Sequence, residues 1–298
     1  MDYKKIIKTR KTRKKILNLF SFIPDELMLR IQYFIKMDRI LRLKRPTRFT
    51  EKIQWYKLKY KNEILADCVD KYEVRKYLSQ KGLSEFLNEI YGIYRSFDEI
   101  NFSKLPDRFV IKNTLGGGNN SVLICKDKKK LDIKKLCNQI KEWDIKINKS
   151  CGREWPYECN TARIIIEKYL VDEKSAFECI TDYKFFCFNG IVKYIVVDIN
   201  RSTNHRRNIY DINWNVVEVE TDCPRIKSKI EKPTLFKEMV ELAQYISQEF
   251  PFVRVDLYCI NDEKIVFGEL TFYPWSGYIK FKPDEFDFIL GEKFIINN

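Results

Sequence analysis

The sequence predicts an α+β protein, because pairs of apolar runs with turn-forming residues between them occur among amphipathic segments. Three such pairs predict antiparallel hairpins, over residues 108–112 and 122–125, 182–188 and 191–199, and 253–260 and 265–271. Helices are expected over residues 50–60, 67–80 and 234–249. Thr50 is a candidate N-cap of the first helix, and Met239 and Ile246 belong to a core-facing stripe on the last. Hairpins combined with separate helices are typical of the α+β class.

The composition permits a buried core and excludes several kinds of site. The chain has 298 residues and is 45% hydrophobic, enough for two or three subdomains. Nine cysteines form no C-x-x-C pair and His205 is the single histidine, so zinc sites and histidine-based triads lack parts. Scattered cysteines without a signal peptide favour a reducing compartment, and no apolar run has the length of a membrane span. We therefore expect a cytoplasmic protein.

The positive charge is concentrated in an N-terminal arm. Residues 1–48 hold 15 basic and four acidic residues, a net charge of +11 out of +13 for the chain, and apolar residues follow the first lysines. Such a segment is typical of contact with an anionic membrane surface, where each clustered basic residue contributes about 1 kcal/mol. A solvated helix beside the core is the alternative. Nucleic acid is not expected, because the aromatic residues are not interleaved with the basic cluster.

Polar side chains gather at one end of the last predicted hairpin. A four-residue turn over 261–264 gives the pairs Ile260–Ile265, Tyr258–Phe267, Asp256–Glu269 and Arg254–Thr271, with all eight side chains on one face. Two opposed carboxylates repel unless a cation lies between them, and Mg²⁺ is the natural cation for oxygen ligands. In the alternative interpretation, Arg254 neutralises both acids without a metal.

A glycine-rich loop follows the strand that ends in Lys112. Gly116, Gly117 and Gly118 are consecutive, and Asn119 comes next. Backbone N–H groups of such a loop can approach phosphates closely, while a lysine supplies a point charge. No G-K-[ST] follows, so this is not a P-loop, and a mobile turn is the simpler alternative.

Two further segments carry candidate polar groups. Apolar residues give way to acids over 167–173, as in a hinge between lobes. Lys184 lies on the opposite face of its strand from Phe185, where it either extends toward solvent or reaches a phosphate. Arg201 and His205 fall in a polar loop suited to an anionic substrate.

In this order, the motifs resemble the ATP-grasp superfamily, and specifically its TupA-like branch, which is associated with bacterial surface-polysaccharide (teichuronopeptide) synthesis. The resemblance extends over about residues 46–281. It rests on P-T-R-F-T-E-K-I-Q-W, D-K-Y-E-V-R-K-Y, F-V-I-K-N-T-L-G-G-G-N, I-I-I-E-K-Y-L, D-Y-K-F-F-C-F-N-G, V-R-V-D-L-Y and F-G-E-L-T-F-Y-P.

The resemblance implies two α+β lobes that clasp ATP, preceded by a basic, mostly helical arm. The arm would comprise residues 1–62, the lobe with the glycine-rich loop 63–166, and the lobe with the Mg²⁺ hairpin 167–298. The residues implied to bind ATP are Lys71 and Lys112 at the α- and β-phosphates, Gly116, Gly117, Gly118 and Asn119 at the γ-phosphate, Glu167, Lys168, Tyr169 and Leu170 at adenine, Asp172 or Glu173 at ribose, and Lys184 at a phosphate.

The same resemblance assigns the metal and the catalytic charges. Asp256 and Glu269 would hold Mg²⁺, and Arg254 would stabilise the charge that develops on the transferred group. Lys184, and Arg201 of the polar loop, are the further candidate catalytic residues. Thr271 stands where many superfamily members have an asparagine as a third metal ligand. Its hydroxyl is shorter and a poorer ligand, which makes a second Mg²⁺ less expected than the first.

The implied activity is that of an ATP- and Mg²⁺-dependent carboxylate–amine ligase that forms an acyl phosphate. Its substrates would be a uronic acid carboxyl of a capsule or cell-surface polysaccharide, or of its precursor, and an amino acid or other amine. A glycan precursor attached to lipid at the inner membrane face would agree with the basic arm. A sugar phosphotransferase and a non-catalytic nucleotide-binding adaptor on a membrane assembly are the alternatives.

Overall fold

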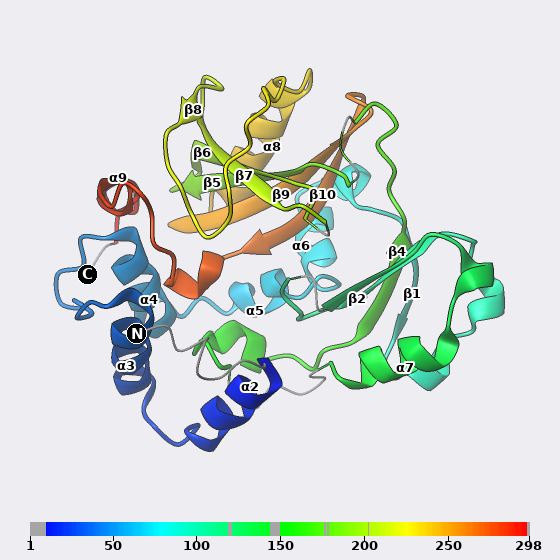
Figure 1. The fold of residues 1–298 in the computed structure, drawn as a ribbon, viewed down its shortest axis with the longest axis horizontal. Coiled ribbons are helices and arrows are strands. Elements are labelled where there is room, and N and C mark those ends of the chain that lie inside the picture. Colours follow the sequence, from blue (N-terminus) through cyan, green and yellow to red (C-terminus); the bar gives the residue numbers. More distant parts are fainter. Residues whose placement is uncertain are drawn as a thin grey trace.

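The computed structural model describes residues 10–118, 121–143, 150–175, 177, 179–201 and 203–296. These residues form two antiparallel sheets with helices around them (Figure 1). The strand order is β1-β4-β2-β3 in the smaller sheet and β10-β9-β5-β6-β7-β8 in the larger one. The mixture of antiparallel sheets and separate helices confirms the predicted α+β class. The predicted division into three parts stays a prediction, and residue 166, where one predicted lobe ends, lies within β4.

The smaller sheet has one covered face and one that presents polar groups. Its strands are β1 (Ile90–Tyr94), β2 (Phe109–Asn113), β3 (Val122–Cys125) and β4 (Ile164–Lys168). Phe109 and Ile111 of β2 pack with Leu136 and Ile140 of α7 (Ile133–Lys141). Because side chains alternate along a strand, Lys112 lies on the face opposite α7.

The larger sheet has one apolar face and one face that carries both aromatic and charged residues. Its strands are β5 (Asp182–Phe188), β6 (Ile191–Ile199), β7 (Arg206–Asp211), β8 (Val216–Val217), β9 (Phe252–Ile260) and β10 (Lys264–Thr271). Helix α8 (Phe236–Ser247) covers the first face, where Phe236 lies against Phe185. On the second face Phe186 packs against Phe49, whereas Lys184 and Asp256 lie further along the strands. This face is therefore aromatic at one end and charged at the other.

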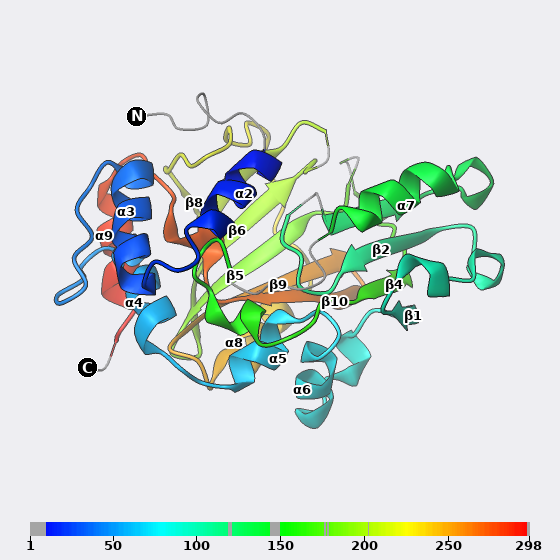
Figure 2. The ribbon, with the colours of Figure 1, turned by 90° about the horizontal axis from the view of Figure 1, so that it is seen from below.

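The remaining helices lie mostly at the other end of the molecule from the smaller sheet. They are α2 (Arg10–Leu19), α3 (Asp25–Met37), α4 (Phe49–Lys59), α5 (Ile64–Val69), α6 (Val74–Gln80) and α9 (Glu285–Lys293). Figure 2 shows α3, α4 and α9 side by side at this end. The prediction that Thr50 caps the first helix is wrong. Thr50 lies inside α4, where its backbone N–H and hydroxyl donate to the buried carboxylate of Asp287 in α9, at 2.9 and 2.8 Å.

The helix predicted over residues 67–80 is two helices, α5 and α6, with an extended residue between them. Asp70 has φ −87° and ψ 123°, and its side chain accepts hydrogen bonds from the backbone N–H groups of Tyr72 and Glu73 at 2.8 and 3.1 Å. An aspartate that accepts such bonds begins a new helix rather than continuing the previous one. Lys71 therefore lies in a connection between two helices.

The pairing of β9 with β10 corrects the predicted register near the turn. The turn has three residues, so Ile260 faces Lys264 and Phe267 faces Leu257, and the predicted pairs Ile260–Ile265 and Tyr258–Phe267 are wrong. A bulge at Gly268 then inserts one residue, and beyond it Asp256 faces Glu269 and Arg254 faces Thr271, as predicted. Phe267 thus lies on the opposite face from Glu269, so the eight side chains do not share one face. The positive φ angles of Asn261 and Asp262, both 54°, allow the shorter turn.

Several elements were not predicted. Helices α7 and α9 and strands β1 and β8 were absent from the predicted set, whereas α3 falls within the arm that was expected to be mostly helical. Strand β7, which follows the expected polar loop of Arg201 and His205, was also not predicted. The strand has charged residues at both ends and Asn208 within it, which conceals its period-two pattern.

Candidate active site

A cleft of about 920 Å³ lies between α6, the segment that leaves β4 and the turn of the β9–β10 hairpin. Among its lining residues are Lys168, Tyr169 and Leu170, three of the four residues predicted at adenine. The backbone of Lys168 donates to the carbonyl oxygen of Glu89 at 2.9 Å, which fixes the start of this segment against β1. The cleft has the size of a small-molecule site and combines basic with apolar groups.

The two predicted ribose residues meet the same hairpin. The carboxylate of Asp172 accepts the backbone N–H of Asn261 at 3.1 Å, and the Asn261 side chain accepts the backbone N–H of Glu173 at 2.8 Å. These bonds place the connection between the two sheets directly against the turn of the larger sheet. One side of the cleft is thereby held to the other.

Lys71 joins three parts of the predicted phosphate site. Its backbone N–H donates to the carbonyl oxygen of Thr114 at 3.0 Å, and its ammonium group donates to that of Gly116 at 2.6 Å. The same Nζ lies 3.6 Å from Oε2 of Glu269 on β10. The interruption of the helix at Asp70 is what places this lysine beside the loop.

The glycine-rich loop connects β2 to β3 and turns tightly at its first glycine. A Cβ atom on Gly116 would collide with the side chain of Ser121, whereas one on Gly117 would meet no atom within 4 Å. Gly118 has φ 75°, a conformation that side chains disfavour. Asn119, which was predicted to belong to this loop's binding groups, lies outside the described residues.

Lys112 and Glu167 form an ion pair on the uncovered face of the smaller sheet. Nζ of Lys112 lies 2.5 Å from Oε2 of Glu167, on the neighbouring strand β4. Burial lowers the pKa of nearby Arg75, and the carboxylate of Glu167 opposes that shift. Glu167, predicted at adenine, thus has a side chain that holds Lys112.

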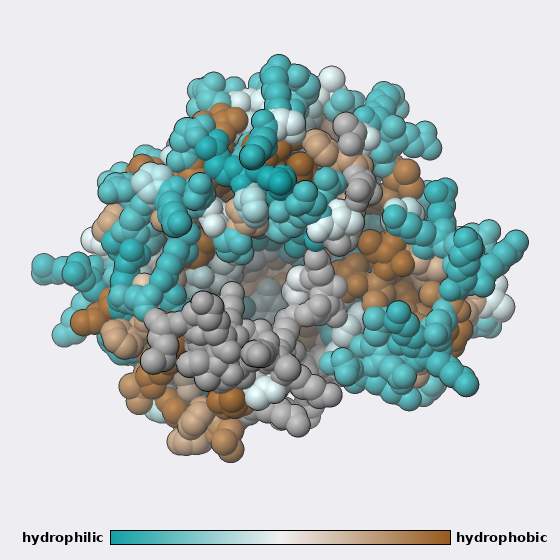
Figure 3. All heavy atoms as spheres, in the orientation of Figure 1, coloured by the Kyte–Doolittle hydropathy of each residue, from teal (hydrophilic) through white to brown (hydrophobic). Residues whose placement is uncertain are grey.

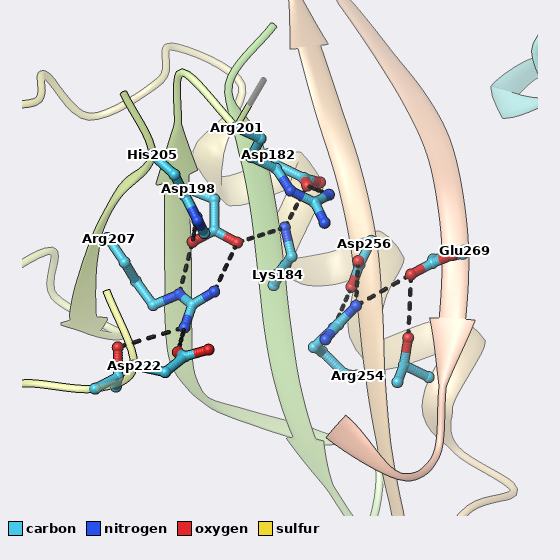
Figure 4. A network of polar contacts seen from close by, with 12 residues as sticks. Asp182, Lys184, Asp198, Arg201, His205, Arg207, Asp222, Arg254, Asp256 and Glu269 are labelled. Carbon is cyan, nitrogen blue, oxygen red and sulfur yellow. Dashed lines mark hydrogen bonds and ion pairs between the residues drawn. The ribbon is translucent and has the colours of Figure 1, made fainter. Parts of the chain in front are cut away.

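The carboxylates predicted to bind metal converge on one guanidinium group (Figure 4). Arg254 donates to both oxygens of Asp256 at 2.6 Å and to Oε1 of Glu269 at 3.2 Å. The hydroxyl of Thr271 donates to the same Glu269 oxygen at 3.4 Å. Burial raises the pKa of Asp256 to about 6, against the opposing effects of Arg254 and Lys184. The structure contains the arrangement in which Arg254 neutralises both acids.

This group of residues also fits a magnesium ion. Its donors are carboxylate and hydroxyl oxygens, which Mg²⁺ prefers, and both carboxylates already approach a single cationic group. Lys71 and Arg254 flank them, so phosphate oxygens could complete the coordination.

Lys184 belongs to a second charged cluster on the same face (Figure 4). Its ammonium group is buried, forms an ion pair with Asp182 on its own strand and lies 3.1 Å from Oδ2 of Asp198 on β6. Arg201 donates to Asp182 at 2.5 Å. Burial opposes ionisation of Asp182, but Lys184 and Arg201 lower the pKa of its carboxyl.

Asp198 is the buried centre of this cluster. His205 Nε2 lies 2.9 Å from Oδ1, and Nε of Arg207 donates to the same oxygen at 2.6 Å. Burial opposes ionisation, yet Lys184, His205 and Arg207 together lower the pKa of Asp198 well below its usual range. The ligand atoms of Asp198, His205 and Cys223 lie within 4.8 Å of one another, but the cations already bound to Asp198 disfavour a metal there.

Sequence reasoning did not identify Asp182 and Asp198 as members of the site. The available signal was positional, because Asp182 shares the strand face of Lys184, and Asp198 interrupts the otherwise apolar run from Ile195 to Ile199. A charged residue in a run of buried strand residues requires a partner.

Comparison with known proteins identifies the family of the chain. The family model described as TupA-like ATPgrasp matches residues 51–295. The chain belongs to this TupA-like ATP-grasp family, which confirms the resemblance and the fold class predicted from the motifs. No curated protein matches the chain.

Several solved structures are similar at low identity. A D-alanine–D-alanine ligase from Bacillus anthracis is 20% identical, with a TM-score of 0.42 over 70% of this chain and 58% of that one. A D-alanine–D-alanine ligase from Helicobacter pylori is 14% identical, with a TM-score of 0.41 over 76% and 60%. An N5-carboxyaminoimidazole synthase from Aspergillus clavatus is 11% identical, with a TM-score of 0.39 over 69% and 44%. The matched part spans less than two thirds of each of these structures.

Proposed function

We propose that this protein is an ATP- and Mg²⁺-dependent carboxylate–amine ligase. The observation that carries the proposal is the position of Lys71, whose ammonium group contacts the glycine-rich loop at Gly116 and lies 3.6 Å from Glu269. A loop suited to phosphates and a carboxylate pair suited to a metal thus meet at one lysine. Sites that transfer a phosphoryl group from a nucleoside triphosphate commonly combine a phosphate-binding loop, a lysine and metal-binding carboxylates.

Nucleotide would occupy the space from the cleft to this lysine. Lys168, Tyr169 and Leu170 would line adenine, with Asp172 or Glu173 at the ribose. The proposed phosphate-binding groups are Lys71, Lys112, Lys184 and the loop of Gly116, Gly117, Gly118 and Asn119. Glu167 would orient Lys112, because the two groups already form a short ion pair.

Asp256 and Glu269 would hold Mg²⁺, with Thr271 as a weak additional oxygen donor. The ion supplies charge neutralisation at the phosphates. Arg254 contacts both carboxylates in the structure and would then face the transferred phosphoryl group. Arg201, whose side chain is 39% exposed beside Asp182, is the proposed contact for the substrate carboxylate.

The chemistry follows from positioning and electrostatic stabilisation. An oxygen of the substrate carboxylate attacks the γ-phosphorus of ATP, the bond between that phosphorus and its bridging oxygen breaks, and ADP leaves. The nitrogen of an amine then attacks the carbonyl carbon of the acyl phosphate, phosphate leaves, and the nitrogen loses a proton to give an amide. A side-chain nucleophile is unnecessary in either step, which suits a site of lysines, arginines and carboxylates.

The proposed carboxylate is a uronic acid of a bacterial capsule or cell-surface polysaccharide, or of its precursor. The proposed amine is an amino acid or a related compound. Membership of the TupA-like family supports this substrate class. We place the reaction in the cytoplasm, at the inner face of the plasma membrane.

The test is ADP release over uronic acids crossed with amino acids, with hydroxylamine present in parallel samples. A ligase yields a hydroxamate, because hydroxylamine intercepts the acyl phosphate. ADP release with a phosphorylated sugar and without hydroxamate would identify a phosphotransferase and reject the ligase. Nucleotide binding without ADP release for any pair of substrates would identify a non-catalytic adaptor.

A further inference from the structure

Large apolar side chains are exposed along α3 and the turn that precedes it. Figure 3 shows the resulting apolar surface at the lower left. At the end of α2 and in the turn, Leu19 is 71% exposed, Phe20 40% and Phe22 78%. The exposed apolar residues of α3 and the segment after it are Leu27, Ile31, Phe34, Ile35 and Ile40. A contiguous surface of this kind marks an interaction site.

Helix α3 is apolar on two sides. Leu29, Tyr33 and Met37 are buried against the body of the protein. Leu27, Ile31 and Phe34 repeat at intervals of four and three residues, so they form a separate stripe along the helix. Packing of the fold explains the first side and leaves the second available to a partner.

A buried arginine fixes the turn between α2 and α3. Arg153 is 4% exposed, and its guanidinium donates to the carbonyl oxygens of Phe20 and Ser21 at 2.8 and 3.2 Å and to Asp25 at 3.3 Å. The turn is therefore held to the body of the protein while its phenylalanine side chains remain exposed. A fixed apolar tip loses little conformational entropy when it binds.

The charge of the arm determines which partner fits this surface. The described acids of the arm already have cationic partners: Asp25 pairs with Arg153, Glu26 with Arg30 and Asp38 with Lys280. By sequence, residues 1–48 carry a net charge of +11, and eight of their basic residues fall between Lys4 and Lys15. An apolar tip within such a basic segment fits an anionic surface that also accepts apolar side chains.

We propose that the turn between α2 and α3, with the outer stripe of α3, docks on an anionic lipid bilayer. Leu19, Phe20 and Phe22 enter the boundary between headgroups and acyl chains, and the net positive charge of the arm favours anionic headgroups. The part of the chain that the structure describes contains no helix that could span a membrane. The proposal deepens the membrane location proposed above and is independent of the ligase chemistry.

The docking surface is connected to the segment that follows β10. Next to Arg153, Glu154 accepts a hydrogen bond from Ser276 and lies 3.5 Å from Nζ of Lys57. Ser276 follows β10, the strand that carries Glu269. Two consecutive residues, Arg153 and Glu154, thus contact the docking turn and the segment after β10.

The test is co-sedimentation with vesicles of phosphatidylglycerol and phosphatidylcholine, compared with vesicles of phosphatidylcholine alone. We expect the full chain to bind the anionic vesicles, and added salt to weaken binding. Replacing Leu19 and Phe22 together by serine should lower the partition coefficient about tenfold. The matched control replaces Ile191 and Val216 by serine, which are 49% and 41% exposed on the larger sheet, and should bind like the parent.

A second variant tests the hydrogen bonds from Arg153 that hold the turn, rather than the apolar side chains of the turn. Arg153→Met should lower vesicle binding more than Lys130→Met, which removes the same charge from an 85% exposed side chain. Unchanged binding of the Leu19/Phe22 variant would overturn the proposal. So would a parent that self-associates through this surface, seen as a dimer in light scattering that the Leu19/Phe22 variant converts to monomer. Nucleotide binding is measured for every variant, so loss of vesicle binding alone is distinguished from failure of the proposed ligase.

Discussion

The ammonium group of Lys71 lies 3.6 Å from a carboxylate oxygen of Glu269, although the lysine precedes the smaller sheet and the glutamate lies on the last strand of the larger one. The same ammonium donates to Gly116 in the glycine-rich loop. The geometry of the proposed phosphate site therefore depends on both sheets and on the interruption of the helix at Asp70.

Lys71→Met should weaken ATP binding about tenfold to a hundredfold. The variant removes a charged hydrogen-bond donor, worth about 1.5–3 kcal/mol, from the proposed phosphate contacts. Isothermal titration calorimetry with a non-hydrolysable ATP analogue measures the change. Lys59→Met, which alters an exposed lysine at the end of α4, is the control. Equal affinities of the two variants would contradict a phosphate role for Lys71.

Asp256→Asn and Glu269→Gln should each abolish Mg²⁺-dependent ADP release. Each change removes one charged oxygen ligand from the proposed metal site. Glu263→Gln is the matched control, because Glu263 lies in the turn of the same hairpin and pairs there with exposed Lys174. Full turnover by either of the first two variants would reject the metal assignment.

Gly116→Ala should reduce ATP turnover severely, whereas Gly117→Ala should have only a small effect on turnover and on folding. The new methyl group at position 116 would collide with Ser121, while position 117 has free space around it. Thermal unfolding and steady-state kinetics of the two variants separate a damaged loop from a damaged fold. Similar kinetics for both would show that the close approach at Gly116 is unimportant.

The buried Lys57 predicts a specific pH dependence of stability. Burial lowers the pKa of Lys57 to about 8, while Glu154 raises it in opposition. Between pH 8 and the ordinary lysine value of 10.5, the unfolded chain binds a proton that the folded chain has released. Stability from this residue therefore rises with pH in that window, by roughly 3 kcal/mol in total.

The comparison that isolates this effect is the free energy of unfolding of the parent minus that of Lys57→Met, measured by urea denaturation at several pH values. The difference should increase from pH 8 to pH 10.5. A flat difference would mean that Lys57 stays protonated in the folded protein. The variant also loses the hydrogen bonds from Lys57 to Ser276. This loss shifts the difference in free energy of unfolding equally at every pH and leaves its slope against pH unchanged.

The sequence was informative where a short segment alone determines the geometry. Asp256 and Glu269 face one another, as predicted, but only because the bulge at Gly268 offsets a turn that is one residue shorter than predicted. Lys112 lies on its predicted strand, whose pattern is contained in one short segment. The binding and catalytic roles of these residues stay predictions.

The missed features depend on contacts between distant segments. Asp198 acquires its importance from Lys184 and Arg207, which occupy neighbouring strands. Threonine is a common residue at helix N-caps, but the backbone N–H and the hydroxyl of Thr50 donate to Asp287, which lies far along the chain. A propensity argument about one segment contains no information on such partners.

The bulge at Gly268 divides the hairpin into two parts. Between the turn and Gly268 the side chains of β10 alternate between the two faces of the sheet in one phase, and beyond Gly268 they alternate in the opposite phase. Removing that single residue would bring Ile265 and Phe267 onto the charged face, or else turn Glu269 and Thr271 toward the core. While the extra residue is kept, apolar residues before the bulge and charged residues after it therefore stay on their separate faces of the sheet. Its position, rather than the length of the turn, determines which side chains reach the proposed active site.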